Sequence, residues 1–287
     1  MTATAASPPA EPKQSLPPIG APPLRALALW FGSAAGAALV LVVAAFVAPY
    51  VPVTPLFAFL IGFAVVAASM VTTALAVPLL PRAALAGVLL AIAALVLVYA
   101  LGLGHGSNIA GAAVVTFALL LGASCVGSVV AGGVEDPGHL LIVAVVFTLV
   151  DTFSVFHAAG PTAAIVENET LISLVALPWP QLGAQTTNIE PFLGMGDIIA
   201  TALFVGVARR HGLHVGRTAA ALFGALALTM AIVLLTEMPI PVLPFMAFAV
   251  LLVHPAARRL RRKDRKPAVL GLLGLMLVYL AVWRFSQ

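Results

Sequence analysis

Two aspartates, Asp151 and Asp197, lie within apolar stretches long enough to be buried in lipid: HLLIVAVVFTLVDTFSVFHA (139–158) and PFLGMGDIIATALFVGVA (191–208). An ionised carboxylate at membrane depth costs at least about 2.5–3.5 kcal/mol, so such residues usually have a functional role. Two carboxylates held close together cannot both ionise easily, so one of them keeps its proton. One can then act as an acid and the other as a base, which is the chemistry of peptide hydrolysis by water.

The elements that carry these aspartates belong to a membrane protein. The chain has 287 residues, of which 62% are hydrophobic and 8% charged, and its mean hydropathy is +1.14. The apolar runs are long and do not alternate, which predicts an all-α polytopic protein rather than a β-barrel. The one cysteine, Cys125, excludes an internal disulfide and is interpreted as a packing residue.

Residues 1–22 are rich in proline, alanine and serine and are predicted to be a disordered tail. Residues 23–287 are predicted to form a single transmembrane domain with about nine spans, each close to the ~20 residues that cross a bilayer. The spans are expected at 24–48, 55–78, 83–103, 108–131, 138–158, 192–209, 216–236, 239–254 and 268–284.

The positions of the basic residues predict the orientation. With the N-terminus inside, every lysine and arginine except Arg284 falls on the inner side, which favours a cytoplasmic N-terminus and an outer C-terminus. We expect an integral, multi-pass protein of a prokaryotic cytoplasmic membrane. The net charge of +4 therefore reflects topology and not nucleic-acid binding. Seven basic residues form a basic cluster that we interpret as an anchor to anionic lipid: Arg258, Arg259, Arg261, Arg262, Lys263, Arg265 and Lys266.

The longest connection, residues 159–191, carries glutamates but no lysine or arginine and is predicted to face outward. Within it, LISLVAL (171–177) is expected to be a linker with an interfacial turn. At ~1.5 Å per residue, Asp151 and Asp197 would lie about 10 and 8 Å from the outer ends of their spans. Matching depths would let the two side chains face one another.

Three motifs resemble those of presenilin and signal peptide peptidase, the GxGD family of intramembrane aspartyl proteases. FLGMGD ends on Asp197 and is followed by FVGVA at 204–208, as in the family. The segment from Asp151 is similar to the family's first aspartate segment, with matches at Ser154, Val155, Gly160, Pro161, Val166 and Glu167. The third motif, Pro-Ala-Leu, is matched by Pro241, Val242 and Leu243 before Pro244. Together the motifs cover a predicted catalytic core at about 138–254.

The resemblance implies an intramembrane aspartic endopeptidase with Asp151 and Asp197 as its catalytic dyad. Gly194, Met195 and Gly196 would then contact substrate, and Pro241, Val242 and Leu243 would shape the site and hold the second aspartate in register. The chain departs from the family at Val150, where tyrosine is usual, and at Val242, where alanine is usual. Compared with the family, the chain also has one predicted helix fewer before the motifs and one more after them.

The resemblance further implies substrates that are transmembrane helical peptides, unwound locally before cleavage and bound by strand addition at 185–192. An outward loop between the aspartates favours spans with the N-terminus inside, such as signal peptides. No metal or organic cofactor is expected, and the oligomeric state is left open.

Other interpretations remain for the same residues. The aspartates could be helix caps or solvated residues near the interface, or they could form a proton relay in a coupled transporter. The chain could be an inactive homologue that binds membrane helices, for example through Gly32-Ser33-Ala34-Ala35-Gly36, although packing within the chain is the simpler interpretation. Prepilin peptidases also carry a GxGD, but there a lysine usually follows; here Ile198 follows Asp197.

Overall fold

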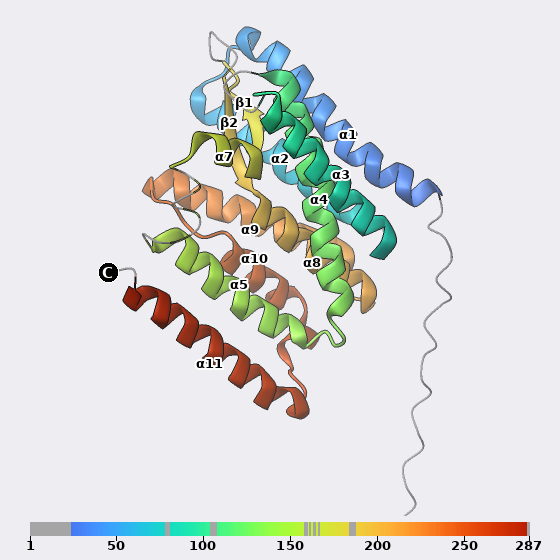
Figure 1. The fold of residues 1–287 in the computed structure, drawn as a ribbon, viewed down its shortest axis with the longest axis vertical. Coiled ribbons are helices and arrows are strands. Elements are labelled where there is room, and N and C mark those ends of the chain that lie inside the picture. Colours follow the sequence, from blue (N-terminus) through green and yellow to red (C-terminus); the bar gives the residue numbers. More distant parts are fainter. Residues whose placement is uncertain are drawn as a thin grey trace, which may run out of the picture.

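The fold is a helical bundle with one small β-hairpin (Figure 1). The computed structural model describes residues 24–77, 81–103, 108–157, 160, 162, 165, 167–183 and 188–285. The predicted tail 1–22 lies outside the described residues. The α-helices are α1 (Leu24–Val47), α2 (Pro55–Ala76), α3 (Pro81–Ala100), α4 (Ile109–Gly133), α5 (His139–Phe156), α7 (Glu169–Val175), α8 (Met195–Arg210), α9 (Val215–Thr236), α10 (Leu243–Val253) and α11 (Arg262–Phe285). The strands are β1 (Ala176–Pro180) and β2 (Ile189–Gly194), and two short 3-10 turns are η1 (Ala48–Tyr50) and η2 (Pro255–Arg258).

Each predicted span contains a helix, and the all-α membrane class is confirmed at this coarse level. Six described helices are long and apolar enough to cross a membrane, namely α1 (with η1), α2, α4, α5, α9 and α11. The helices α8 and α10 are shorter, and only Leu85–Ala100 of α3 counts as an apolar helix, so the count of nine crossings stays a prediction. The expected span at 192–209 is partly wrong, because its first residues belong to β2 and the helix begins at Met195.

The centre of the bundle is α8, which carries Asp197 near its start. Its residues from Ala200 to Ala208 are all buried, and α4 makes the most extensive contact with it. This contact depends on Gly127 of α4, where an added Cβ would lie 2.2 Å from the Ile199 carbonyl oxygen. A glycine therefore lets the two backbones approach closely enough to fix α8 in the core.

The hairpin between α7 and α8 was not predicted as such. The segment 171–177, expected as a linker, forms most of α7 and the start of β1. The strands pair antiparallel, with Ala176 opposite Gly194 and Trp179 opposite Glu190. The backbone N–H of Gln181 donates to the backbone carbonyl of Asn188 at 2.8 Å. Because the N–H groups of successive strand residues point to opposite edges, the backbone nitrogens of residues 178 and 180 point away from β2. Both are prolines, and the buried outer edge of β1 therefore lacks N–H groups that would need partners there.

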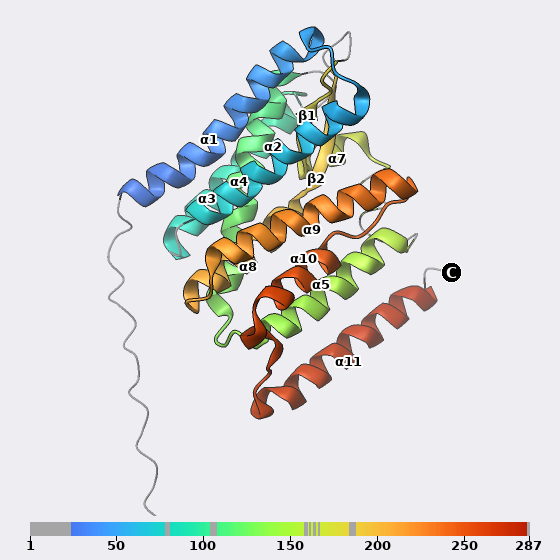
Figure 2. The same ribbon diagram turned by 180° about the vertical axis from the view of Figure 1, so that it is seen from behind.

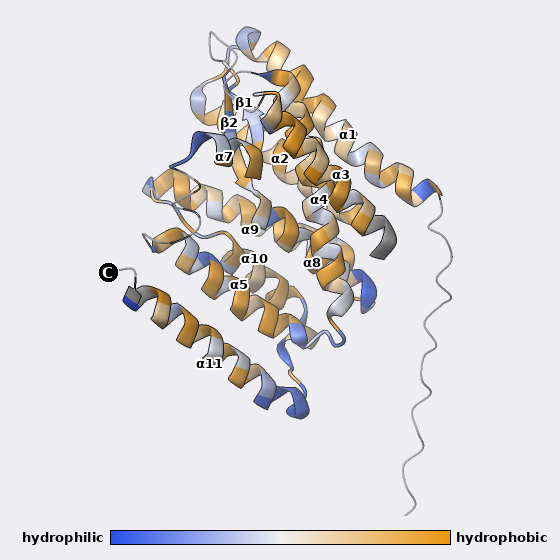
Figure 3. Cartoon of the chain, in the orientation of Figure 1, coloured by the Kyte–Doolittle hydropathy of each residue, from blue (hydrophilic) through white to orange (hydrophobic). Residues whose placement is uncertain are grey.

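The two ends of the bundle differ in charge. The hairpin lies at one end, which we call the hairpin end, and the basic cluster lies at the other, which we call the basic end. Figure 3 shows apolar helix bodies with hydrophilic residues gathered at the helix ends. At the basic end, Arg209 donates to the Val77 carbonyl at 2.6 Å and the Arg258 Nε donates to the Leu251 carbonyl at 2.6 Å. These bonds satisfy a last-turn carbonyl of α10 and the carbonyl of the residue that follows α2.

The helix that carries Asp151 lies near one edge of the bundle. Figures 1 and 2 both show α9, α10, α5 and α11 side by side in that order, with α11 outermost. Only Leu140 and Ala144 of α5 are buried, and α5 packs mainly on α10. On α1, Gly32 and Gly36 have open space beside them. Ala34 of the same pattern is buried in the main core, so the expectation that the pattern packs within the chain is correct for Ala34 and wrong for the two glycines among the described residues.

Candidate active site

Asp151 is held by the start of α10. Its Oδ2 accepts a hydrogen bond from the Leu243 N–H at 2.8 Å. Leu243 is the first residue of α10, and first-turn N–H groups have no acceptor within their own helix. Pro244 follows within this first turn, where the missing N–H of proline costs nothing. The Pro-Val-Leu-Pro segment thus starts a helix and offers a free donor to the first aspartate.

This contact corrects one expectation. The motif Pro241, Val242 and Leu243 was expected to hold the second aspartate in register, whereas its hydrogen bond goes to Asp151. Val242 is half-buried and packs against the main core, so its larger side chain is accommodated without breaking this bond. Val150, the other departure from the family pattern, is 41% exposed and faces outward.

Asp197 lies in the first turn of α8. Its Oδ2 accepts a hydrogen bond from the Gly194 N–H at 3.1 Å, which is one half of a capping box. Because Gly194 has no side chain, the reciprocal half cannot form. The interpretation of Asp197 as a helix cap is therefore correct for one oxygen atom, and Oδ1 has no hydrogen bond of this kind. Asp197 is also only two residues from the start of α8, closer to its end than expected.

The two aspartates approach each other between α5 and α8. Phe147 and Phe204 meet edge to face with ring centroids 6.1 Å apart, so the faces that carry them are in contact. Asp151 lies one turn after Phe147, and Asp197 lies two turns before Phe204, on those same faces. Helix α5 runs toward the hairpin end and α8 runs away from it (Figure 1). Asp151 therefore lies nearer the hairpin end than Phe147, and Asp197 lies nearer that end than Phe204.

An apolar groove of about 400 Å³ adjoins the GxGD segment. It lies between α7, β2 and the segment around Thr162, and Gly194, Met195 and Gly196 line its end beside Asp197. Met195 is 40% exposed, and a Cβ at Gly196 would meet nothing within 4 Å. The groove therefore ends at the residues that directly precede the second aspartate, and it leaves room for a peptide backbone there.

The segment after α5 turns back on the helix end. The Ser154 and Thr162 hydroxyls are 2.6 Å apart, and the Thr162 N–H donates to the Ser154 Oγ at 3.1 Å. Gly160 fits inside this turn, where an added Cβ would lie 2.4 Å from the Ser154 carbonyl oxygen. Ser154 and Gly160 thus hold Thr162, which lines the groove, in place. Pro161 and Val166 lie outside the described residues.

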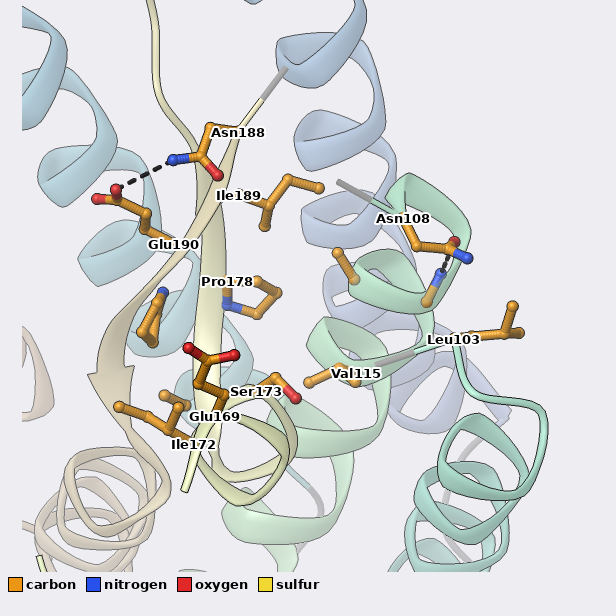
Figure 4. A pocket seen from close by; sticks show the side chains of 14 residues that line it. Leu103, Asn108, Val115, Glu169, Ile172, Ser173, Pro178, Asn188, Ile189 and Glu190 are labelled. Carbon is orange, nitrogen blue, oxygen red and sulfur yellow. Dashed lines mark hydrogen bonds between the residues drawn. The ribbon is translucent and has the colours of Figure 1, made fainter. Parts of the chain in front are cut away.

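A second pocket of about 480 Å³ lies between the hairpin, α7 and the start of α4 (Figure 4). It shares Ile172, Ala176 and Pro191 with the apolar groove. Its own lining is more polar, with Asn108, Glu169 and Ser173 around it, and Asn188 donates to Glu190 at 3.2 Å. The surface beside β2 therefore changes from apolar near Asp197 to polar at the far end of the strand.

Sequence reasoning found both aspartates and the α10 motif but missed the residues that connect them. Thr162 and the β1 strand were not singled out, although ALPWP (176–180), with its two prolines around a tryptophan, disfavours a helix interior. The predicted strand at 185–192 is observed as Ile189–Gly194, and residues 185–187 lie outside the described residues. Among the described residues, no group of three or more histidine, cysteine or acidic side chains could hold a metal ion.

Comparison of the chain with protein-family models, with curated proteins and with solved structures yields no match. The resemblance to the GxGD proteases consequently rests on the three motifs and on the way the fold brings them together.

Proposed function

We propose that this protein is an intramembrane aspartyl protease of the presenilin and signal peptide peptidase type, with Asp151 and Asp197 as its dyad. The observation that carries the proposal is the hydrogen bond from Leu243 to Asp151, which joins residues 92 positions apart. It brings the third motif onto the first aspartate, and the Phe147–Phe204 contact supports a position for Asp197 on the facing side of α8. These contacts support one common site for the three motifs, which follow the family's order along the chain.

The chemistry would use only these two side chains and water. A protonated aspartate donates a hydrogen bond to the scissile carbonyl, and the other carboxylate takes a proton from a water molecule. The resulting hydroxide adds to the carbonyl carbon while the carbonyl oxygen takes the proton of the acidic aspartate, which forms a tetrahedral diol. As the C–N bond breaks, the nitrogen takes the proton that the other aspartate removed from water, and one diol hydroxyl returns its proton to the first aspartate. The products are a carboxylic acid and an amine, and the dyad regains its starting protonation.

The groove beside β2 supports a transmembrane peptide as the substrate. One edge of β2 is already paired with β1, and every residue of β1 is buried. An added strand would therefore pair with the other edge of β2. An extended peptide along this edge would pass from the apolar groove to the polar pocket of Figure 4. That gradient fits a chain that leaves the lipid and enters water.

The test is cleavage by purified protein in detergent. Wild type, Asp151→Asn and Asp197→Asn would each be incubated with single-span peptides, with and without an aspartyl-protease transition-state analogue. We expect wild type to cleave and the analogue to block it, and each variant to lose at least about 100-fold in rate. Proton-driven solute flux that depends on either aspartate, without peptide cleavage, would instead favour the transporter. Binding of the peptide without cleavage or flux would indicate an inactive homologue.

A further inference from the structure

A small cavity lies inside the bundle, behind the hairpin and away from the aspartates. Helices α1, α2 and α4 and the strand β1 surround it, and its volume open to the centre of a water molecule is about 10 Å³. Most of its lining is apolar. The exceptions are Ser69 of α2, Thr116 of α4 and Trp179 of β1.

Two of these polar side chains lack hydrogen-bond partners. Trp179 is 5% exposed and Thr116 is 6% exposed, yet the indole Nε1 and the threonine Oγ1 have no partner among the described residues. Leaving a buried polar group unpaired costs about 1–3 kcal/mol, so such groups in folded proteins nearly always bind something. The Ser69 hydroxyl donates to the Val65 carbonyl at 2.8 Å and still has lone pairs that can accept.

We propose that one ordered water molecule occupies this cavity and bridges Trp179, Thr116 and Ser69. It accepts a hydrogen bond from the Trp179 Nε1–H and forms hydrogen bonds with the two hydroxyl groups. Buried waters make about three such bonds, and a cavity of roughly 10–15 Å³ by this measure holds one. The space excludes any larger ligand.

The bridge connects the hairpin to the helices that support it. Trp179 packs over α2 at Gly62, where an added Cβ would lie 2.4 Å from the indole ring. Opposite Trp179, Glu190 belongs to β2, and β2 leads directly to Gly194 and its bond to Asp197. The water therefore positions the strand that precedes the second aspartate. This inference holds whether or not the protein cleaves peptides.

The direct test is an NMR experiment on the full chain in detergent micelles, with ¹⁵N-labelled tryptophan. The chain has only three tryptophans, so three indole N–H signals are expected, and Trp179→Phe identifies the relevant one. We expect this signal to show a cross-peak to a long-lived water in wild type. The cross-peak should be lost or strongly weakened in Thr116→Val.

Thr73→Val is the matched control. Thr73 is also a fully buried threonine without a hydrogen-bond partner among the described residues, but it does not line this cavity. Its replacement should leave the water cross-peak unchanged. If Thr116→Val does not fold, Ser69→Ala removes another partner of the water and should weaken the same cross-peak. The absence of a water cross-peak in wild type, or its equal loss in Thr73→Val, would overturn the proposal.

Discussion

At the scale of residues, the main finding is that each aspartate is held by a backbone N–H of a helix start. Leu243 serves Asp151 and Gly194 serves Asp197. Each bond uses one carboxylate oxygen, so the two groups are oriented while retaining an oxygen for other partners. Both donors exist because helix starts leave N–H groups unpaired.

The residue Val242 offers a test of this arrangement. Replacing Val242 with alanine, the family's residue, removes half-buried bulk without touching the Leu243 N–H. We predict that Val242→Ala folds normally and cleaves substrates with large side chains near the scissile bond several-fold faster in kcat/KM. Val150→Ala is the control, because Val150 is the other departure from the family pattern and is 41% exposed, so its replacement should leave cleavage unchanged. Slower cleavage of such substrates by Val242→Ala would show that the valine does not narrow the site.

His254, at the basic end, predicts a pH dependence of stability. Burial lowers the pKa of its imidazole below the usual 6.5, and the charges of His214 and Arg217 act in the same direction. His254 therefore binds a proton more weakly in the folded chain than in the unfolded chain. Its contribution to stability is fully present above about pH 6.5 and is lost as the pH falls through the lower pKa of the folded state. The Thr218 hydroxyl lies 2.7 Å from its Nε2.

We predict that the melting temperature of wild type falls between pH 7.5 and pH 5, and that His254→Gln shows a smaller fall. Glutamine keeps a polar group near Thr218 but does not titrate. Melting curves of both proteins in the same detergent provide the comparison. An equal fall in the two proteins would assign the pH dependence to other groups.

At the scale of elements, the contact between α4 and α8 sets the position of Asp197. Gly127→Ala would place a methyl group 2.2 Å from the Ile199 carbonyl oxygen, and neither backbone can move away cheaply. We predict a loss of about 1–3 kcal/mol in stability, as is typical of overpacking. Gly133→Ala on the same helix meets nothing within 4 Å and should be neutral. Denaturant unfolding of both variants measures the difference.

Helix α11 contacts α5, the helix that carries Asp151, through isolated side chains. Near the basic end, His139 and Asp264 approach to 3.3 Å and Arg261 pairs with Asp136 at 2.6 Å. Near the other end, the Phe153 and Tyr279 rings lie 4.7 Å apart. The helix that follows the family's third motif thus contacts the first catalytic candidate's helix at both of its ends.

We predict that Tyr279→Ala lowers stability by about 0.5–1.5 kcal/mol, the usual contribution of an aromatic pair. Tyr99→Ala is the matched control, because Tyr99 is 64% exposed on α3. Chemical denaturation followed by circular dichroism would measure both. Equal stabilities of the two variants would mean that the contact between Phe153 and Tyr279 does not stabilise the packing of α11 on α5.

The helices could be predicted from sequence because apolar runs of span length have few alternative structures in lipid. The residue at which α8 begins could not be predicted from sequence, because the strand residues PFLG (191–194) are as apolar as the helix that follows them. β1 was missed because every one of its residues is buried, which removes the alternation that marks a strand. The bond between Asp151 and Leu243 was also beyond prediction, because motif spacing along a chain does not say which helix ends meet.

At the scale of the whole molecule, the separation of basic residues and hairpin onto opposite ends agrees with the sequence-based topology but does not orient it in a membrane. We predict that the hairpin end faces outward. In a Cys125→Ala background, a membrane-impermeant maleimide should label Gln181→Cys in intact cells and label Lys263→Cys only after permeabilisation. Both positions are exposed, and Cys125 is the chain's one cysteine. The reverse pattern would invert the topology and the substrate preference with it.

The central claim is that Asp151 and Asp197 hydrolyse a peptide bond within a membrane span. Its most direct test is mass-spectrometric mapping of the cut in a single-span peptide reconstituted in liposomes with the protein. Because Asp151 lies five residues, or about 8 Å, before the end of α5, we predict a cut in the half of the span nearest the hairpin end. That is the C-terminal half of a peptide whose N-terminus is inside, and the cut should disappear with Asp197→Asn. No cut in either peptide orientation, or a cut that persists in Asp197→Asn, would contradict the account.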